Sequence, residues 1–224
     1  VAVSSQEMRD IEKAAAKNGV SKLSMMENAG ANVANFIQES FENKSMKDNN
    51  KFRIVLVAGT GNNGGDVFVA ARHLAFWKNN LIISLFLIGE EENIKAFEAD
   101  VNWKILKKFD QIDRIILDSE QKFSILDQKL SSADVIAVGI FGTGFRGKPK
   151  ELQRKVIEEI NKLEKVDVIS VDIPSGLDAD TGSYETVVKS DYTITMHAPK
   201  TGMLSQSGLQ VCGQILVANI GIPL

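Results

Sequence analysis

The stretch VAGTGNNGGD, residues 57–66, joins two kinds of sequence pattern. Residues 53–58, which overlap its start, form an almost continuous apolar run that predicts a buried strand. Residues 65–77, which overlap its end, have the apolar spacing of a helix. Three glycines spaced G-x-G-x-x-G lie between them and allow a tight turn with close backbone approach to a ligand. A strand, a glycine-rich turn and a helix in this order are typical of a parallel α/β sheet.

The alternation of strand and helix patterns continues along the chain. Further strands are expected at Leu81–Ile88, Arg114–Leu117, Asp134–Phe141, Asp167–Val171, Tyr192–Met196 and Gln214–Val217, with helices at Asn93–Phe109, Phe123–Leu130 and Pro149–Leu163. Short apolar runs without alternation predict strands covered on both faces, and regular alternation with helices predicts parallel pairing. We therefore expect one doubly wound α/β domain over residues 1–224, with helices on both faces of a mostly parallel central sheet.

Two helices are expected before the first strand. Ser4 and Glu7 form a capping-box pattern that opens the first helix, and a second helix is expected from about Ser24 to Glu42. Residues 44–51 then form a polar connection. The apolar stripes of the two helices suit two roles, covering the sheet or forming a dimer interface, and the sequence favours neither.

Composition and charge exclude several classes of function. The formal net charge is −3, so nucleic acid and anionic membranes are not favoured partners. The longest apolar run is far shorter than the roughly 20 residues that span a bilayer, and the polar N-terminus lacks a signal-peptide core. A single cysteine rules out an internal disulfide and a zinc site of clustered cysteines. We expect a cytoplasmic location.

Polar residues follow several predicted strands, at the edge where open α/β sheets bind ligands. In the first such loop, residues 59–66, the glycines and the following helix N-terminus suit an anion. Asn62 and Asn63 add amide groups that a plain turn does not need. The alternative is a tight turn in which Asp66 complements the helix dipole. The Lys-Ser/Thr pair of a nucleoside-triphosphate loop is absent.

The second loop is FGTGFRGKPK, residues 141–150. Its three glycines can offer backbone donors, and Arg146 and Lys148 add positive charge, which together suit a phosphate or pyrophosphate. The alternative is a surface turn before a helix that starts near Pro149.

The third loop is VDIPSGLDADTG, residues 171–182. Asp172 ends an apolar strand, and a carboxyl group partly buried at such an edge has its pKa raised towards the range useful for acid–base catalysis. Ser175 supplies an oxygen ligand or hydrogen bonds, while Asp178 and Asp180 are interpreted as turn formers. The alternative for Asp172 is a helix or turn cap.

The two histidines and the cysteine predict no further centre. His197 and Lys200 follow another strand, in TMHAPKTGML, but a single histidine without a partner is more often packed or at the surface. His73 lies inside a predicted helix and is interpreted as structural. Cys212 has no basic neighbour in sequence and is interpreted as an inert small residue. No spacing indicates a transition-metal site.

Five segments together resemble one known family. They are EMRDIEKAAAKNGVSKLSMMENAG, VAGTGNNGGDVFVAARHL, FGTGF, VDIPSGLDADTG and TITMHAPKTGML, and their order covers almost the whole chain. The chain resembles the YjeF N-terminal domain family, the NAD(P)H-hydrate epimerases. GNNGGD followed by DIPSGLD is a specific pair, more informative than the glycine fingerprint. The resemblance implies a Rossmann-like three-layer fold that is usually dimeric.

The resemblance also implies a reaction. Such enzymes act on NADHX or NADPHX, in which water has added to the 5,6 double bond of the nicotinamide ring, and interconvert the R and S epimers at C6 so that a dehydratase can repair the S form. One carboxyl group that gives and then takes a proton is sufficient for this chemistry. The matching positions are Asp172 for acid–base catalysis; Asn62, Asn63, Gly64, Gly65, Asp66, Gly142, Thr143, Gly144, Phe145, Arg146, Gly147 and Lys148 for substrate; and Asn63 and Ser175 for a potassium ion.

The chain departs from the family pattern at two positions. Val138 stands three residues before the FGTG phenylalanine, where the family usually has a potassium-binding aspartate, and a valine cannot ligate a cation. Val67 replaces a small residue after GNNGGD. Both changes affect the expected ion binding and affinity more than the acid–base group.

Other functions and chain arrangements stay open. Loss of the acid at Val138 keeps open, as the alternative to the epimerase, a non-catalytic scaffold of the same fold that binds a nucleotide or a protein partner. An ordinary NAD-dependent oxidoreductase is disfavoured because no Tyr-Lys or His-Asp arrangement appears, and Glu90–Glu92 resemble a solvated helix start rather than a ribose-binding acid. The ending VANIGIPL resembles the start of a dehydratase domain, and the chain lacks an initiator Met. It is therefore expected to be a stand-alone epimerase or half of a bifunctional protein.

Overall fold

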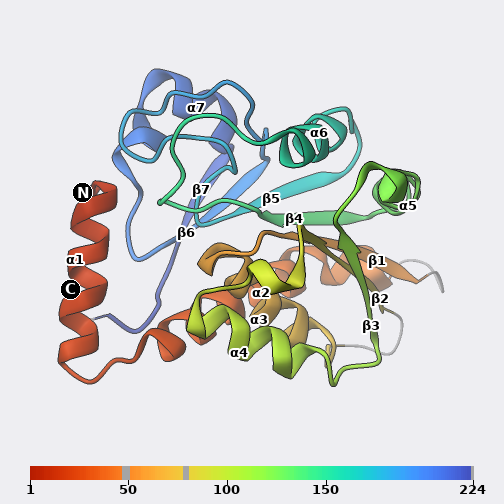
Figure 1. Cartoon of the computed structure of the whole chain (residues 1–224), viewed down its shortest axis with the longest axis horizontal. Coiled ribbons are helices and arrows are strands. Elements are labelled where there is room, and N and C mark those ends of the chain that lie inside the picture. The colour runs from red at the N-terminus through yellow and green to blue at the C-terminus, as the bar shows by residue number, and fades with distance from the viewer. Residues whose placement is uncertain (47–50, 78–80, 223–224) are drawn as a thin grey trace.

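Seven strands form one sheet through the middle of the molecule (Figure 1). The computed structural model describes residues 1–46, 51–77 and 81–222. The strands are β1 Phe52–Ala58, β2 Leu81–Ile88, β3 Ile112–Leu117, β4 Val135–Gly139, β5 Asp167–Val171, β6 Tyr192–Met196 and β7 Gln214–Ala218. Their order is β3-β2-β1-β4-β5-β6-β7, and each neighbouring pair is parallel. The predicted α/β fold class is thus confirmed.

Helices cover both faces of this sheet (Figure 1). They are α1 Ser5–Lys17, α2 Lys22–Met46, α3 Asn62–Leu74, α4 Phe97–Leu106, α5 Phe123–Ser131, α6 Glu151–Ile160 and α7 Gln206–Cys212. Along β1, Ile54 and Leu56 join the core with α2, α3 and α4, whereas Val55 and Val57 join the core with α5 and α6. Because both faces are buried, the strands read as continuous apolar runs rather than alternating ones.

Helix α2 packs apolar side chains against the core of the fold. Met26 and Val33 belong to the same buried cluster as residues of α3. Gly30 allows this close packing, because a methyl group there would lie 2.4 Å from Cβ of Val69. The apolar stripe of α2 therefore covers the fold, which is one of the two roles expected of it. None of the helices in the described ranges is long and apolar enough to cross a membrane.

Element boundaries differ from expectation at several places. Helix α3 begins at Asn62 rather than Gly65, and α2 continues to Met46 into the expected polar connection, of which residues 47–50 lie outside the described residues. The predicted helices 93–109 and 149–163 are shorter, and Glu91–Asn93 is a separate 3₁₀ turn. Helix α7 was not predicted, because Gly208 interrupts its short apolar pattern.

The strand order places a topological switch between β1 and β4. From β1 the chain moves outward through β2 and β3, and then returns to β4 on the other side of β1. The connections that leave β1 and β4 at their carboxyl ends therefore diverge and leave a crevice between them. The two turns still touch at their base, where the Gly59 amide donates to the Gly139 carbonyl over 3.0 Å.

Candidate active site

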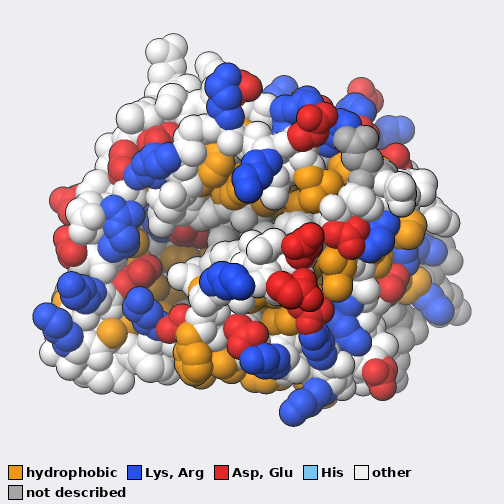
Figure 2. Space-filling view, viewed as in Figure 1, with side chains coloured by type: hydrophobic (Ala, Val, Ile, Leu, Met, Phe, Trp, Pro, Cys, Tyr) orange, Lys and Arg blue, Asp and Glu red, His pale blue; other side chains and the backbone are white. Residues whose placement is uncertain are grey.

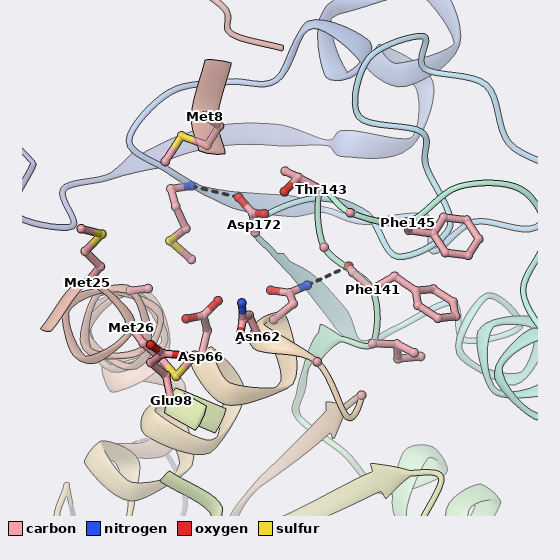
Figure 3. Close-up of a pocket in the computed structure, with 18 of the residues that line it drawn as sticks. Met8, Met25, Met26, Asn62, Asp66, Glu98, Phe141, Thr143, Phe145 and Asp172 are labelled. Atoms are coloured by element: carbon pink, nitrogen blue, oxygen red, sulfur yellow. Dashed lines mark hydrogen bonds between the residues drawn. The ribbon is translucent and has the colours of Figure 1, made fainter. Parts of the chain in front are cut away.

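A cavity of about 510 Å³ opens at this switch point. Its lining includes the turn after β1, the loop after β4, Asp172 after β5, and side chains of α1 and α2. Figure 2 shows the surface hollowed between the two layers of helices, with apolar side chains in the hollow. In the close-up, Asn62 and Asp66 lie on the part of α3 that faces Asp172 (Figure 3). The size suits a cofactor-sized ligand.

The turn after β1 leaves backbone donors open to the cavity. The first amides of a helix have no intrahelical partner. Because Gly61 caps α3 without a side-chain hydrogen bond, these amides are available to attract an anion. Gly64 lies against the start of the turn, where an added methyl group would come within 1.9 Å of the Gly59 carbonyl oxygen. Gly64 and Gly65, which were predicted to bind substrate, are buried and lie outside the cavity lining, where they allow close packing.

Asn63 joins three loops beneath the cavity. Its Nδ2 donates to the carbonyl of Phe141, at 2.8 Å, and to that of Val171, at 2.9 Å. These two bonds fix the side chain, and they leave Oδ1 buried without a hydrogen-bond partner. A buried amide oxygen in this state calls for a donor or a cation.

The other positions expected to hold potassium do not fit that role. The Ser175 hydroxyl accepts from the amides of Ile140, at 3.0 Å, and Phe141, at 3.1 Å, and also donates to the Phe141 carbonyl. Its capacity is therefore used in joining the loops after β4 and β5. Val138 is fully buried in the core shared with α5 and α6. Of the three positions, only Asn63 keeps a side-chain oxygen without a partner, so the set does not form an ion site on its own.

The loop after β4 divides into two parts. Residues 142–145 line the cavity, and the Phe141 and Phe145 rings stack with centroids 4.3 Å apart (Figure 3). Arg146 does not line the cavity as the sequence suggested. Its guanidinium instead pairs with Asp180 and bonds Ser5 Oγ, which ties this loop to the start of α1. Gly147 and Lys148 also lie outside the lining, and Lys148 pairs with Glu185 near the surface.

Asp172 is held more tightly than the sequence indicated. It follows the last residue of β5 with a left-handed φ of 64°, which is rare for a residue other than glycine. The ammonium of Lys200 lies 2.6 Å from its Oδ1. Its Oδ2 faces Gly142, where a methyl group on the glycine would lie 3.6 Å away. Oδ1 thus binds the Lys200 ammonium, whereas Oδ2 is directed to the loop that lines the cavity.

Three further acids line the cavity with Asp172, namely Glu12, Asp66 and Glu98. Burial raises the pKa of Asp66 well above its usual 3.8, and the carboxylates of Asp172 and Glu12 raise that pKa further. Burial likewise raises the pKa of Glu12 on α1, with Asp172 as the next contribution. Lys200 acts against both increases. The carboxyl groups of Asp172, Asp66 and Glu12 therefore interact around the buried Lys200, and the site favours protonation of Asp66 and Glu12.

His73 and Cys212 lie outside the cavity lining. Nε2 of His73 lies 2.8 Å from Glu27, which also pairs with Arg72, so this group joins α2 to α3. Burial raises the pKa of the Cys212 thiol to about 12, which keeps it unreactive at neutral pH. Among the described residues, no group of three or more His, Cys, Asp and Glu side chains could hold a metal ion.

Sequence reasoning did not identify several side chains of the site. Lys200 belongs to the segment after β6, and no local sequence pattern predicts that its side chain is buried. Glu12 had a clearer signal, because it occupies the same helical stripe as Met8 and Ala15 and is an acid on an apolar face. Met8, Met25 and Met26 complete one side of the cavity (Figure 3).

Comparison with known proteins points to a single family. A sequence profile described as YjeF-related protein N-terminus matches residues 22–202. An NAD(P)H-hydrate epimerase of Cenarchaeum symbiosum is 36% identical over 222 residues, which cover 99% of this chain and 95% of that protein. The crystal structure of yeast ynu0, YNL200c, superposes with a TM-score of 0.77 and 25% identity, over 90% of this chain and 82% of the yeast chain.

Other relatives are longer than this chain. A bifunctional NAD(P)H-hydrate repair enzyme Nnr of Methanothermobacter thermautotrophicus is 40% identical over 212 residues. The match covers 92% of this chain and 37% of that protein. The chain therefore corresponds to well under half of such a bifunctional relative.

Proposed function

This chain belongs to the family of YjeF-related N-terminal domains, and on that premise we propose that it is an NAD(P)H-hydrate epimerase. Its substrate would be NADHX or NADPHX, and its reaction the interconversion of the R and S forms at C6 of the hydrated nicotinamide ring. Relatives that this chain covers over nearly their whole length are named for this activity. The proposal therefore concerns the activity of the chain itself and does not depend on a fused second domain.

One observation carries the proposal at the level of chemistry. Asp172 lies at the carboxyl edge of the sheet with Oδ2 towards the cavity, between the turn after β1 and the loop after β4. A carboxyl group that is oriented, nearly buried and close to two anion-binding loops suits proton transfer on a dinucleotide.

The proposed reaction needs no redox change. A proton is delivered to the C6 hydroxyl, the lone pair of the ring nitrogen forms a C=N bond, and the C–O bond breaks to release water. The planar cation that results accepts water at either face of C6, and that water loses its proton to a carboxylate. Asp172 would move the proton at C6, which makes general acid–base catalysis the main contribution of the protein.

The rest of the cavity would hold the dinucleotide. The open amides at the start of α3 suit a pyrophosphate, because the helix N-terminus attracts negative charge. Gly142 and Gly144 let the backbone of the second loop approach the ligand closely, and Asn62 offers an amide at the cavity surface. Arg146 and Lys148 would act indirectly, since their ion pairs hold the loop in place.

Three further features are part of the proposal. A potassium ion would have Asn63 Oδ1 as its side-chain ligand, and weak binding is expected because the other positions do not fit. A homodimer is supported by large exposed apolar side chains such as Phe76 and Phe97, and Figure 2 shows hydrophobic atoms along the edge over α2 and α4. A dehydratase would act on the S epimer in the same compartment, which we propose is the cytoplasm.

A coupled assay tests the proposed function. The protein is incubated with R-NADHX and an S-specific dehydratase, and the recovery of NADH is followed. We expect recovery faster than the spontaneous rate, and a loss of roughly 10²- to 10⁴-fold in Asp172→Asn, because that change removes the proton-transfer group. The assay is run in potassium chloride and in choline chloride of equal ionic strength.

A matched variant separates the role of this carboxyl group from a general loss of charge. Asp113 lies near the start of β3 and pairs with Lys129, at the edge of the sheet opposite the cavity. Asp113→Asn is expected to keep full activity. If the unchanged protein gave no acceleration in either salt, the scaffold alternative would replace the enzyme. Full activity of Asp172→Asn would show that Asp172 is not the proton-transfer group.

A further inference from the structure

Lys200 is a fully buried lysine whose ammonium makes three hydrogen bonds. Its side chain has no exposed area. The ammonium contacts Asp172 Oδ1 at 2.6 Å, Thr195 Oγ1 at 2.9 Å and the Met196 carbonyl at 2.9 Å. An ammonium has three donors, so this set satisfies it completely. Lysine is almost never fully buried unless it is paired, which makes its position here a specific feature of the fold.

The pair gives the two oxygens of Asp172 different surroundings. Oδ1 receives the Lys200 ammonium and also lies 3.4 Å from the Met196 amide. Oδ2 is directed to Gly142 in the cavity lining. The carboxylate can therefore not rotate to exchange its oxygens without breaking a buried ion pair.

The same ammonium joins two strained turns. Asp172 and His197 both have φ of 64°, and among the described residues they are the non-glycine positions with left-handed backbone. Asp172 directly follows β5, and His197 directly follows β6. Lys200 binds the side chain of the first and the carbonyl that precedes the second. Strained backbone of this kind persists where surrounding contacts hold it, and it is concentrated at active sites.

The N-terminal segment covers the lysine from outside. The amide of Val3 donates to the Pro199 carbonyl, and the amide of Thr201 donates to the Val3 carbonyl, each over 2.9 Å. These bonds bracket Lys200 and form an isolated parallel bridge with Val3. Water is thereby kept from the ion pair, which strengthens its electrostatic coupling.

We infer that Lys200 is a positioning residue for the proposed epimerase reaction. It holds Asp172 by Oδ1, so that Oδ2 alone faces the substrate and is directed for proton transfer at C6. Lys200 itself is sealed behind Asp172 and does not touch the substrate. This inference rests on the proposed function for its catalytic part, but the coupling between the two side chains is a property of the protein alone.

Lys200→Met tests the inference, because methionine keeps an unbranched side chain and removes the charge. We expect kcat to fall roughly tenfold or more, with KM unchanged, because the oriented base is lost while the binding loops remain. The acid-side fall of kcat should also move to higher pH, since a buried carboxylate without its cation is protonated more readily. The other titratable groups facing Asp172 are Glu12 and Asp66, with Arg9 and Lys22 near Glu12.

Two more variants control for structure and for charge. Lys129→Met removes a partly exposed lysine at the opposite edge and should leave kcat and its pH profile unchanged. Lys200→Arg keeps the charge in a different shape, so kcat should fall while the acid side of the profile stays in place. If Lys200→Met does not fold, as judged by its circular dichroism and melting curve, the arginine variant decides. An arginine variant with its acid side moved, or a methionine variant with unchanged kcat and profile, would overturn the inference.

A substrate-free measurement separates this inference from the proposed function. In protein labelled with ¹³C at the aspartate carboxyl carbons, the Asp172 resonance is followed through a pH titration. The Asp172→Asn variant assigns the signal. We expect the midpoint in Lys200→Met to lie above that of the unchanged protein, whether or not the protein turns over NADHX. An equal midpoint in the two proteins would refute the coupling, whereas absence of turnover alone would refute only the proposed reaction.

Discussion

Asp66 is an acid held where its charge is disfavoured. Its pKa is raised well above 3.8 by burial and by the nearby carboxylates of Asp172 and Glu12. A group of this kind lowers stability wherever the unfolded chain would be ionised, because folding must then either bind a proton or bury a charge. Natural proteins keep such residues at sites that function requires.

The pH dependence of stability follows from the direction of this pKa. Well below pH 3.8 Asp66 is protonated in both the folded and unfolded states and has no effect. As the pH rises, the unfolded state loses its proton first, so the free energy of unfolding falls until the pH exceeds the raised pKa of the folded state. Asp66→Asn should therefore melt at a higher temperature than the unchanged protein at pH 7, and the difference should be much smaller near pH 3.5.

Melting curves at the two pH values measure this effect, with Asp113→Asn as the control at an exposed site. A variant of Asp66 that melts lower than the unchanged protein at pH 7 would contradict the account. Equal differences at both pH values would show that the effect is not one of ionisation.

At the scale of elements, local pattern predicted the type of most helices and strands but not their limits. Three strands, β2, β5 and β6, have the predicted bounds, because an apolar run between polar turns is sufficient to define them. The start of α3 was missed by three residues. The asparagines and glycines there disfavour a helix locally, but contacts with the Gly59 carbonyl and the loop after β4 hold the first turn in place. Such contacts join residues far apart in sequence.

The turn between β1 and α3 offers a matched pair of glycines. A methyl group at Gly64 would overlap the Gly59 carbonyl oxygen, whereas one at Gly61 would meet nothing within 4 Å. Gly64→Ala should lower the free energy of unfolding by roughly 1–3 kcal/mol or more, because backbone must move to make room. Gly61→Ala should leave it nearly unchanged. Urea denaturation measures both, and equal stability of the two variants would mean that the close packing of this turn is not rigid.

At the scale of the whole molecule, the chemistry is assembled at a switch in strand order. The sequence allowed Asp172 and the glycine loops to be assigned to one edge of the sheet, because all of them follow predicted strands. It did not allow Lys200 or Glu12 to be placed there, since their positions depend on how a loop and a helix pack over that edge. It also suggested Arg146 as a ligand group, whereas the folded chain uses it to tie α1 to the loop after β4.

Isotope labelling tests the central claim most directly. Purified R-NADHX is incubated with the protein in ¹⁸O-labelled water. The R and S forms are separated by chromatography, and the mass of each is measured by mass spectrometry. The account predicts that the S form appears faster than without protein and carries ¹⁸O at C6, because the hydroxyl leaves as water and solvent water replaces it. Formation of the S form at the spontaneous rate, or without ¹⁸O, would contradict it.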